Sequence, residues 1–253
     1  MKQLENGWHL PDIDQTMTRK IIGDDDITNS NYEIHIRHAI LDYIPIRKTF
    51  IDVGANVGVW SLNMHKHFDR VVAYEPSPMN IECFEANLDS LQHGANIELR
   101  TKAVGDTNTE VSFRDSGKNC GNNKIIEEET DNSYKVTQVT LDDDLNENVS
   151  LIKIDVQGYE LQTIKGAIET IEKNKAWVAH EVNQDVDIIC SIMEKLGYQM
   201  IRVSSKRMFI WAPTTGHMAP SGNDVARVFG RSLGPGPYAE KYGLGPKLSR
   251  AKS

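Results

Sequence analysis

The fold is decided by FIDVGANVG at residues 50–58, an apolar run that passes into a glycine-containing turn. Residues 50–53 have the character of a buried strand, and Asp52 lies near its end. Gly54 and Gly58 then allow the backbone to turn tightly and to approach a bulky ligand. The stretch predicts a strand, a ligand-binding loop that includes Asn56, and the start of a helix. Because two glycines also occur in ordinary turns, the neighbouring segments are needed to distinguish a ligand-binding loop from a simple turn.

A second apolar run, VVAYEP at residues 71–76, ends in Glu75 and Pro76. In doubly wound folds, an acid about 20 residues beyond the glycine loop accepts the ribose hydroxyls of a nucleotide cofactor. The loop lacks the middle glycine of dinucleotide-binding loops and the lysine of phosphate-binding loops. Both differences favour S-adenosylmethionine, whose ammonium group Asp52 could hold directly or through an ordered water.

Strand and helix patterns alternate along the middle of the chain. Strands are expected at residues 50–53, 71–75, 97–104, 151–154 and 177–182, followed by an antiparallel hairpin of residues 198–203 and 207–211. Such alternation predicts an α/β fold with a doubly wound, mostly parallel, seven-stranded sheet and helices on both faces. Asp106 follows the third strand and is a candidate acceptor for the adenine amino group, although GDTN at residues 105–108 is equally typical of a turn.

The composition changes at both ends of the chain. Residues 1–29 are polar and contain three consecutive aspartates at 24–26, which predicts an N-terminal loop extension. Residues 30–212 are expected to form one domain, beginning with a helix from residue 34 whose capping box is Ser30 and Glu33. Residues 213–253 are rich in glycine, proline and basic residues, which predicts a flexible tail that folding does not require. The polar residues 115–134 are interpreted as a mobile insertion beside the site.

Charge and cysteine content exclude several classes of function. The 253 residues carry a formal charge of -8, so no global attraction to nucleic acid or anionic membranes is expected. The three cysteines are scattered and odd in number, as is typical of free thiols in a reducing compartment, and no metal site is predicted. No apolar leader or bilayer-length stretch occurs, so a cytoplasmic location is expected. The sequence does not predict an oligomeric state.

The most distinctive junction is LIKIDVQGYE at residues 151–160, where a strand passes into a helix. Asp155 and Glu160 lie at this junction, and His180 and Glu181 end the next strand. All four are candidate catalytic bases for methyl transfer, because carboxyl ends of parallel strands converge on a bound ligand. Two alternatives stay open: Asp155 as a helix cap, and His180 as a structural residue within the sheet.

Three segments, at residues 50–58, 74–78 and 151–161, resemble the FkbM-type branch of class I S-adenosylmethionine-dependent methyltransferases. The resemblance covers residues 30–212 and implies a Rossmann-like fold, S-adenosylmethionine as cofactor, and O-methylation of a hydroxyl on a sugar, glycan or other small polar molecule. Gln157 departs from the family pattern, which commonly has glutamate there. The alternative function is a non-catalytic module that binds a nucleoside ligand or a partner. The aromatic-containing loop of amino-directed DNA methyltransferases and the cysteine of cytosine C5 enzymes are both missing from the sequence.

Overall fold

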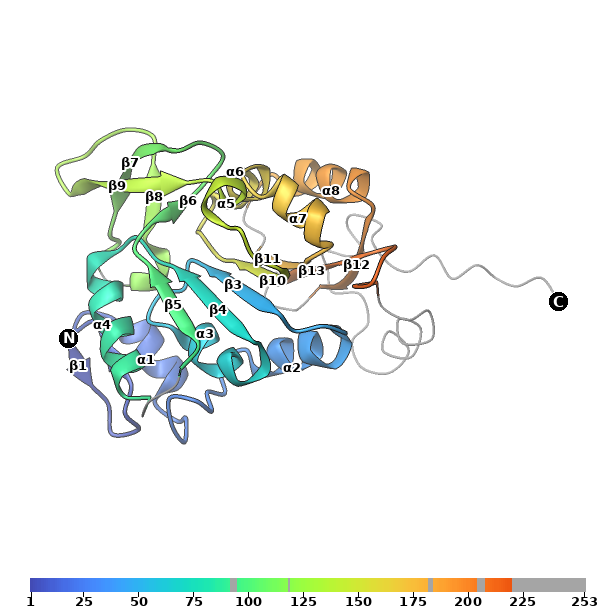
Figure 1. Ribbon diagram of the computed structural model, residues 1–253. Helices are drawn as coiled ribbons and strands as arrows, with labels where there is room; N and C mark the ends of the chain where they lie inside the picture. Colours follow the sequence, from blue (N-terminus) through green and yellow to red (C-terminus); the bar gives the residue numbers. More distant parts are fainter. Residues whose placement is uncertain (92–94, 118, 182–183, 204–207, 220–253) are drawn as a thin grey trace.

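A computed structural model describes residues 1–91, 95–117, 119–181, 184–203 and 208–219. Its centre is a seven-stranded sheet with the order β12-β13-β11-β10-β3-β4-β5 (Figure 1). The five central and edge strands β3 (Thr49–Val53), β4 (Arg70–Tyr74), β5 (Ile97–Arg100), β10 (Val149–Ile154) and β11 (Trp177–Glu181) are parallel. The hairpin β12 (Tyr198–Val203) and β13 (Met208–Pro213) closes the sheet in antiparallel pairing. The predicted α/β fold is confirmed.

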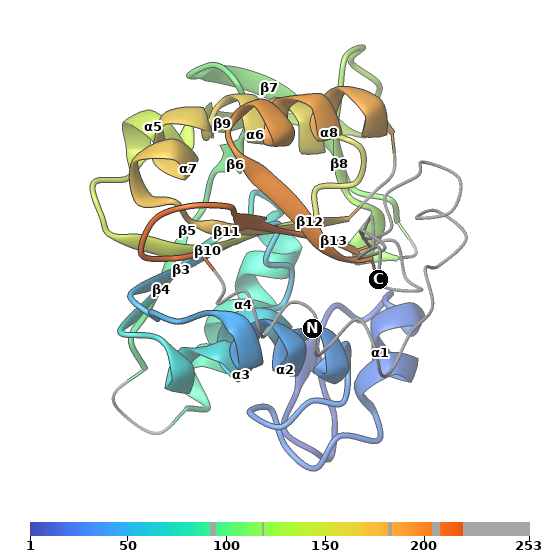
Figure 2. The ribbon, with the colours of Figure 1, turned by 90° about the vertical axis from the view of Figure 1, so that its right-hand side faces the viewer.

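Helices cover both faces of this sheet, as the view in Figure 2 shows. One layer contains α2 (Ile34–Tyr43), α3 (Val59–Met64), η1 (His65–His67) and α4 (Pro78–Asp89). The opposite layer contains α5 (Leu141–Asp144), α6 (Glu160–Lys165), α7 (Ile168–Asn174) and α8 (Val186–Lys195). Apolar side chains fill the space between each layer and the sheet, with Ile152 and Ile154 in one core and Phe50 and Leu151 in the other.

The prediction of one continuous third strand at residues 97–104 is wrong. It divides into β5 and a two-residue strand β6 (Ala103–Val104) that leaves the main sheet. In a second sheet of order β6-β9-β7-β8, β6 pairs with β9 (Ser133–Val139), which also pairs with β7 (Thr109–Arg114). The remaining strand is β8 (Lys124–Ile126), preceded by the short helix η2 (Cys120–Asn122). The segment interpreted as a mobile insertion therefore contributes regular structure to this second sheet.

The helix expected after residue 160 is interrupted at Gly166, which separates α6 from α7. A Cβ atom at Gly166 would overlap the carbonyl oxygen of Gly105, at the end of β6. Only glycine allows the two backbones to lie this close. Ile164 of α6 and Ile171 of α7 are both fully buried in the same core, on either side of this break.

The N-terminal segment is folded, so the predicted loop extension is wrong. Strands β1 (Lys2–Gln3) and β2 (His9–Leu10) pair, and helix α1 (Gln15–Ile21) follows. Trp8, Leu10 and Ile21 are fully buried against residues of α3 and α4. Asp24 is also buried, and its carboxylate accepts a hydrogen bond from the amide of Asn31. A few apolar residues in a polar segment are enough to attach it to the domain.

Helix α2 forms as predicted, but its capping box does not. Ser30 Oγ accepts from the amide of Tyr32, and the Glu33 carboxylate accepts from the indole of Trp60. Glu33 itself has φ 53°, in the left-handed region. The helix buries Ile36 and Ile40, whereas His38 on another face is exposed. The helix ends at Tyr43, two residues before Pro45, because a residue that precedes proline is disfavoured in the helical conformation.

The tail begins later than predicted. The side chain of Met218 is 1% exposed, and its carbonyl oxygen accepts a hydrogen bond of 2.8 Å from the indole N–H of the buried Trp177. Met218 therefore completes the core around Trp177 of β11, although residues 214–217 before it are exposed. Most of the predicted tail, residues 220–253, lies outside the described residues. Within the described part of the chain, no helix has the length and apolar character needed to cross a membrane.

We expect a chain that ends at Ala212 to be less stable than one that ends at Ala219. The shorter chain loses the packing of Met218 and leaves the Trp177 N–H without its acceptor, which together should cost at least about 3 kcal/mol. For a domain of this size, that corresponds to a melting temperature lower by roughly 6–12 °C. Thermal denaturation of the two truncated proteins measures the difference. Equal melting temperatures would show that Met218 does not contribute to stability.

Candidate functional site

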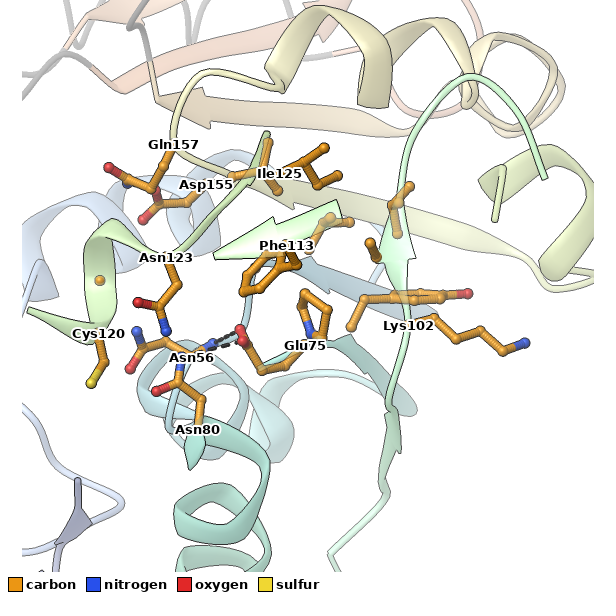
Figure 3. A pocket seen from close by; sticks show the side chains of 18 residues that line it. Asn56, Glu75, Asn80, Lys102, Phe113, Cys120, Asn123, Ile125, Asp155 and Gln157 are labelled. Atoms are coloured by element: carbon orange, nitrogen blue, oxygen red, sulfur yellow. Dashed lines mark hydrogen bonds between the residues drawn. The ribbon is translucent and has the colours of Figure 1, made fainter. Parts of the chain in front are cut away.

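A cavity lies at the carboxyl edge of the central strands, where β3, β4 and β10 end (Figure 3). Its floor comes from the glycine loop and from the strand ends, and its roof from β7, β8 and η2 of the second sheet. The lining residues are Val53, Gly54, Asn56, Tyr74, Glu75, Pro76, Asn80, Lys102, Ala103, Val104, Phe113, Cys120, Gly121, Asn123, Ile125, Asp155, Val156 and Gln157.

Glu75 is the buried carboxylate of this cavity. Its Oε2 accepts from the amide of Asn56 at 2.8 Å, and its Oε1 accepts from the amide of Ser77 at 3.0 Å and from Asn80 Nδ2 at 3.2 Å. Burial raises the pKa of Glu75 from 4.5 to about 7, against the lowering effect of these three hydrogen bonds. A carboxylate can accept about four hydrogen bonds, so the described contacts leave capacity on Oε2 for a ligand hydroxyl.

Asn80 adds a second acceptor beside Glu75. Because its Nδ2 donates to the carboxylate, the orientation of the amide is fixed, and Oδ1 points away from Glu75. The side chain is 1% exposed and lines the cavity, and no donor within the described residues reaches Oδ1. Leaving such a group without a donor costs about 1–3 kcal/mol. This geometry suits a ligand that presents hydroxyl or amino donors at this position.

The glycine loop is shaped by backbone contacts. Gly54 has φ 72°, and a Cβ atom there would overlap the carbonyl oxygen of Asp155. Gly58 has φ 92°, and a Cβ atom would overlap the side chains of Leu62 and Phe84. Asn56 lies between them with φ 54°, an uncommon conformation that asparagine tolerates better than most residues. Both glycines are therefore required by the fold of the loop, and Gly54 also lines the cavity.

Asp52 does not take the predicted position beside a ligand. It is fully buried, its Oδ2 accepts from Ser61 Oγ at 2.7 Å, and its Oδ1 lies 3.2 Å from Lys153 Nζ. Lys153 also donates to the carbonyl oxygen of Gly54. Burial alone would lower the pKa of Lys153, but the nearby carboxylates of Asp52 and Asp155 reverse this effect and raise it. Asp52 therefore fixes Lys153, which in turn holds the glycine loop.

Asp155, Gln157 and Glu181 form a polar group at the end of β10 and β11. Gln157 Nε2 donates to Asp155 Oδ1 at 2.7 Å and to Glu181 Oε2 at 3.1 Å. Gln157 has φ 56°, so the backbone is turned in the left-handed region to place this side chain. Asp155 lines the cavity with 27% of its side chain exposed, and Gln157 lines it too. The glutamine amide therefore holds two carboxylates together, where a third acid would repel both.

Three of the four predicted catalytic residues, Glu160, His180 and Glu181, do not line the cavity. Glu160 is 1% exposed at the start of α6, where its Oε1 accepts from the amide of Gly158. His180 is fully buried, and its Nε2 accepts from the indole N–H of Trp211 at 3.0 Å. Since indole can only donate, this network assigns the proton to Nδ1, which then donates to the carbonyl oxygen of Glu181. Burial lowers the pKa of His180 to about 4, which leaves the ring neutral and structural.

Asp106, the predicted adenine acceptor, is exposed and does not line the cavity. The residues that line this part of the cavity instead are Lys102, Ala103 and Val104, from just before and within β6. Asp106 follows β6, which belongs to the second sheet and not to the main sheet, so it does not lie at the carboxyl edge of the main sheet. The sequence pattern placed Asp106 correctly after a strand, but that strand ends in the second sheet.

Sequence analysis missed the residues of the roof. Cys120, Gly121, Asn123 and Ile125 lie in residues 115–134, which were interpreted as a mobile insertion, and Phe113 lies just before that segment. The alternation of Val111 and Phe113 was the available signal, since period-2 apolar residues are typical of a half-buried strand. No group of three or more metal-ligating side chains occurs within the described ranges.

Comparison with known proteins identifies the family of this chain. Residues 52–200 match the model of the family described as Methyltransferase FkbM domain. The chain belongs to the FkbM methyltransferase family. The match begins at the buried Asp52 of β3 and ends within β12, so it includes the floor and roof of the cavity.

Relatives of this FkbM domain are distant. Methyltransferase 1 of Beauveria bassiana (strain ARSEF 2860) is 22% identical over 142 residues, which are 46% of this chain and 57% of the relative. The crystal structure of an FkbM methyltransferase from Methylobacillus flagellatus KT has a TM-score of 0.50 and 18% identity, over 66% of this chain and 43% of that one. The structure of SMU.1697c from Streptococcus mutans in complex with SAH has a TM-score of 0.45 and 11% identity, over 70% and 94% of the two chains. The chain thus spans about half the length of the first two relatives.

We expect the stability of the ligand-free protein to depend on the ionisation of Glu75. Its folded-state pKa is raised from 4.5 to about 7, so the folded protein binds more protons than the unfolded chain between these values. The stability contribution of Glu75 is present below pH 4.5 and is lost as pH rises through 7, by up to about 3 kcal/mol.

The measurement is the free energy of unfolding from pH 5 to pH 8, for wild type and for Glu75→Gln. The variant should lack this part of the pH dependence, whatever its absolute stability. Glu110→Gln, which changes an exposed carboxylate on β7, is the matched control and should follow the wild type. An unchanged pH slope in Glu75→Gln would contradict the raised pKa.

Proposed function

We propose that this FkbM domain is an S-adenosylmethionine-dependent O-methyltransferase that acts on a hydroxyl of a sugar or other small polar molecule. The observation that carries the proposal is Glu75, a buried carboxylate in a cavity at the carboxyl ends of parallel strands. In doubly wound folds, ligands bind at this edge, and an acid at the end of the second strand accepts ribose hydroxyls. Asn80 Oδ1 provides a further acceptor beside it.

The lining residues suit the parts of S-adenosylmethionine. Glu75 and Asn80 would hold the ribose, and the apolar Val104, Phe113 and Ile125 would contact the adenine ring. The polar floor around Gly54 and Asn56 would hold the methionine part, with Asp52 acting from below through Lys153. When bound, the cofactor supplies an electrophilic methyl group on a sulfonium.

Asp155 is the proposed base for the acceptor hydroxyl. Of the four sequence-predicted candidates, it alone lines the cavity within the described residues, and Gln157 fixes its orientation. Glu181 shares the same amide and would bind another hydroxyl of the acceptor. Because a base and a well-oriented acceptor both accelerate methyl transfer, this polar group combines the two contributions. A polyhydroxylated acceptor matches two carboxylates that can each accept hydrogen bonds.

Cofactor binding is tested by calorimetry with S-adenosylhomocysteine as the probe. Glu75→Ala removes the ribose acceptor and should weaken binding by about 1.5–3 kcal/mol, or roughly 10–150-fold. Glu110→Ala, which alters the exposed carboxylate on β7, should bind like wild type. Binding by Glu75→Ala at wild-type affinity would remove Glu75 from the cofactor site.

Catalysis is tested by mass spectrometry of methylated products across sugar, lipid and nucleoside hydroxyls. With an acceptor identified, Asp155→Asn should lower turnover by about 10²–10⁴-fold while the affinity for S-adenosylhomocysteine stays nearly constant. Glu160→Gln is the comparison, since Glu160 is buried against the backbone of Gly158 and should affect melting more than turnover.

Two outcomes would revise the proposal. Full turnover by Asp155→Asn would leave alignment of the reactants as the source of the rate. Cofactor binding without any methylated product across the panel would favour the non-catalytic binding module.

A further inference from the structure

We infer that Asp14 is a positioning residue that holds the roof of the cofactor cavity, an inference that rests on the proposed function. Asp14 lies outside residues 52–200, which match the family model. It is fully buried, and its two carboxylate oxygens accept hydrogen bonds from two residues that lie far apart from each other in the sequence. Oδ1 accepts from the amide of Met17 at 2.8 Å, and Oδ2 accepts from the amide of Cys120 at 3.0 Å.

The contact with Met17 is an ordinary helix cap, since Asp14 is the N-cap residue of α1. The contact with Cys120 joins residues 106 positions apart. A hydrogen bond to an ionised carboxylate is about twice as strong as one between neutral groups, and burial removes competition from water. One side chain therefore fixes both the start of α1 and the start of η2.

Within the described residues, the other hydrogen bonds at η2 are local to its loop or are made by Asn123, the residue that follows it. Its amide at Gly121 is bonded to Asn119 Oδ1, within the same loop. The Cys120 thiol packs against Met79 Sδ at 3.9 Å, and Asn123 Nδ2 donates to Ser77 Oγ. Cys120 and Gly121 line the cavity, as Figure 3 shows for Cys120 beside Asn56 and Asn80. A change in the position of η2 thus changes the wall of the cavity next to the proposed ribose acceptors.

The N-terminal segment is itself attached to the cofactor-binding part of the domain. The backbone of His9 exchanges hydrogen bonds with the side chain of Asn87 on α4, at 2.6 and 3.1 Å. Asn87 Nδ2 also donates to the carbonyl oxygen of Val57 in the glycine loop. Asp14 therefore connects the roof of the cavity to a segment that is already fixed against its floor.

The thiol of Cys120 reports the position of η2 without any ligand. It is 3% exposed, and burial, with Asp14 and Asp115 adding to the effect, raises its pKa to about 12, so it should react slowly with a maleimide. The test compares four variants of the full chain, of which Asp115→Asn removes another carboxylate that raises the thiol pKa and so gives the increase in labelling that charge alone produces. Asp14→Ser keeps a helix cap but is too short to reach Cys120, Asp14→Ala removes both contacts, and Asp26→Ser is the control in the same segment.

The readouts are the labelling rate at each cysteine, located by mass spectrometry, and the affinity for S-adenosylhomocysteine. Asp14→Ser and Asp14→Ala should both label Cys120 at least about 10-fold faster and should bind S-adenosylhomocysteine at least about threefold more weakly. Labelling of the fully buried Cys83 should stay as in wild type. Asp26, which accepts from Thr28 and makes no described contact with η2, should be replaceable without either effect.

Three outcomes would overturn the inference. Wild-type labelling and affinity in Asp14→Ser would show that Asp14 acts only as a cap. Faster labelling of Cys83 together with Cys120 would indicate general loosening of the domain. Faster labelling of Cys120 with unchanged affinity would show that η2 does not shape the cofactor site. If wild type fails to bind S-adenosylhomocysteine, the proposed function fails, while the labelling rates still decide whether Asp14 holds η2.

Discussion

The structure depends on a buried ion pair between the two central strands. Asp52 on β3 and Lys153 on β10 are register partners, and both are almost completely buried. A charge in the interior is costly unless it is paired and hydrogen-bonded. Here Ser61 Oγ donates a hydrogen bond to Asp52, and Lys153 donates one to the carbonyl oxygen of Gly54. Loss of Lys153 would leave the Asp52 carboxylate without its cation, and loss of Asp52 would leave Lys153 with the carboxylate of Asp155 at 3.9 Å. The pair thus fixes the register of the sheet and the glycine loop at the same time.

The architecture was largely readable from the sequence because its strands and helices have strong periodic patterns. The glycine loop, the acid after β4 and the β10 junction all lie where the patterns placed them. The errors occurred where tertiary contacts override local patterns. Gly166 ends α6 because the backbone of Gly105 lies against it, and this contact spans about 60 residues of sequence. The N-terminal segment was misread because only a few apolar residues, such as Trp8 and Leu10, attach it to the core.

The candidate site was only partly predictable, for a related reason. Glu75, Gly54 and Asp155 were found because strand ends are local features that meet at one edge of a parallel sheet. His180 also lies near the end of a strand. Trp211, on the neighbouring strand β13, donates a hydrogen bond to its Nε2, so this nitrogen is not available to a ligand. Asp52 was placed beside the ligand because nothing in the sequence shows that Lys153 lies opposite it. Burial and partner identity are properties of the packed fold, and no spacing rule contains them.

The floor and the roof of the cavity are held by different kinds of contact. On the floor, the amides of Gly54 and Ala55 donate to the carbonyl oxygen of Tyr74, and the amide of Asp155 donates to that of Val53. In the roof, β7 and β8 belong to the second sheet, whereas η2 is attached through side chains, among them Asp14, Asn123 and Ser77. Main-chain bonds survive most substitutions, whereas side-chain bonds require particular residues at both ends. The floor can therefore tolerate substitution of its side chains, whereas the position of η2 depends on the residues present at positions 14, 77 and 123.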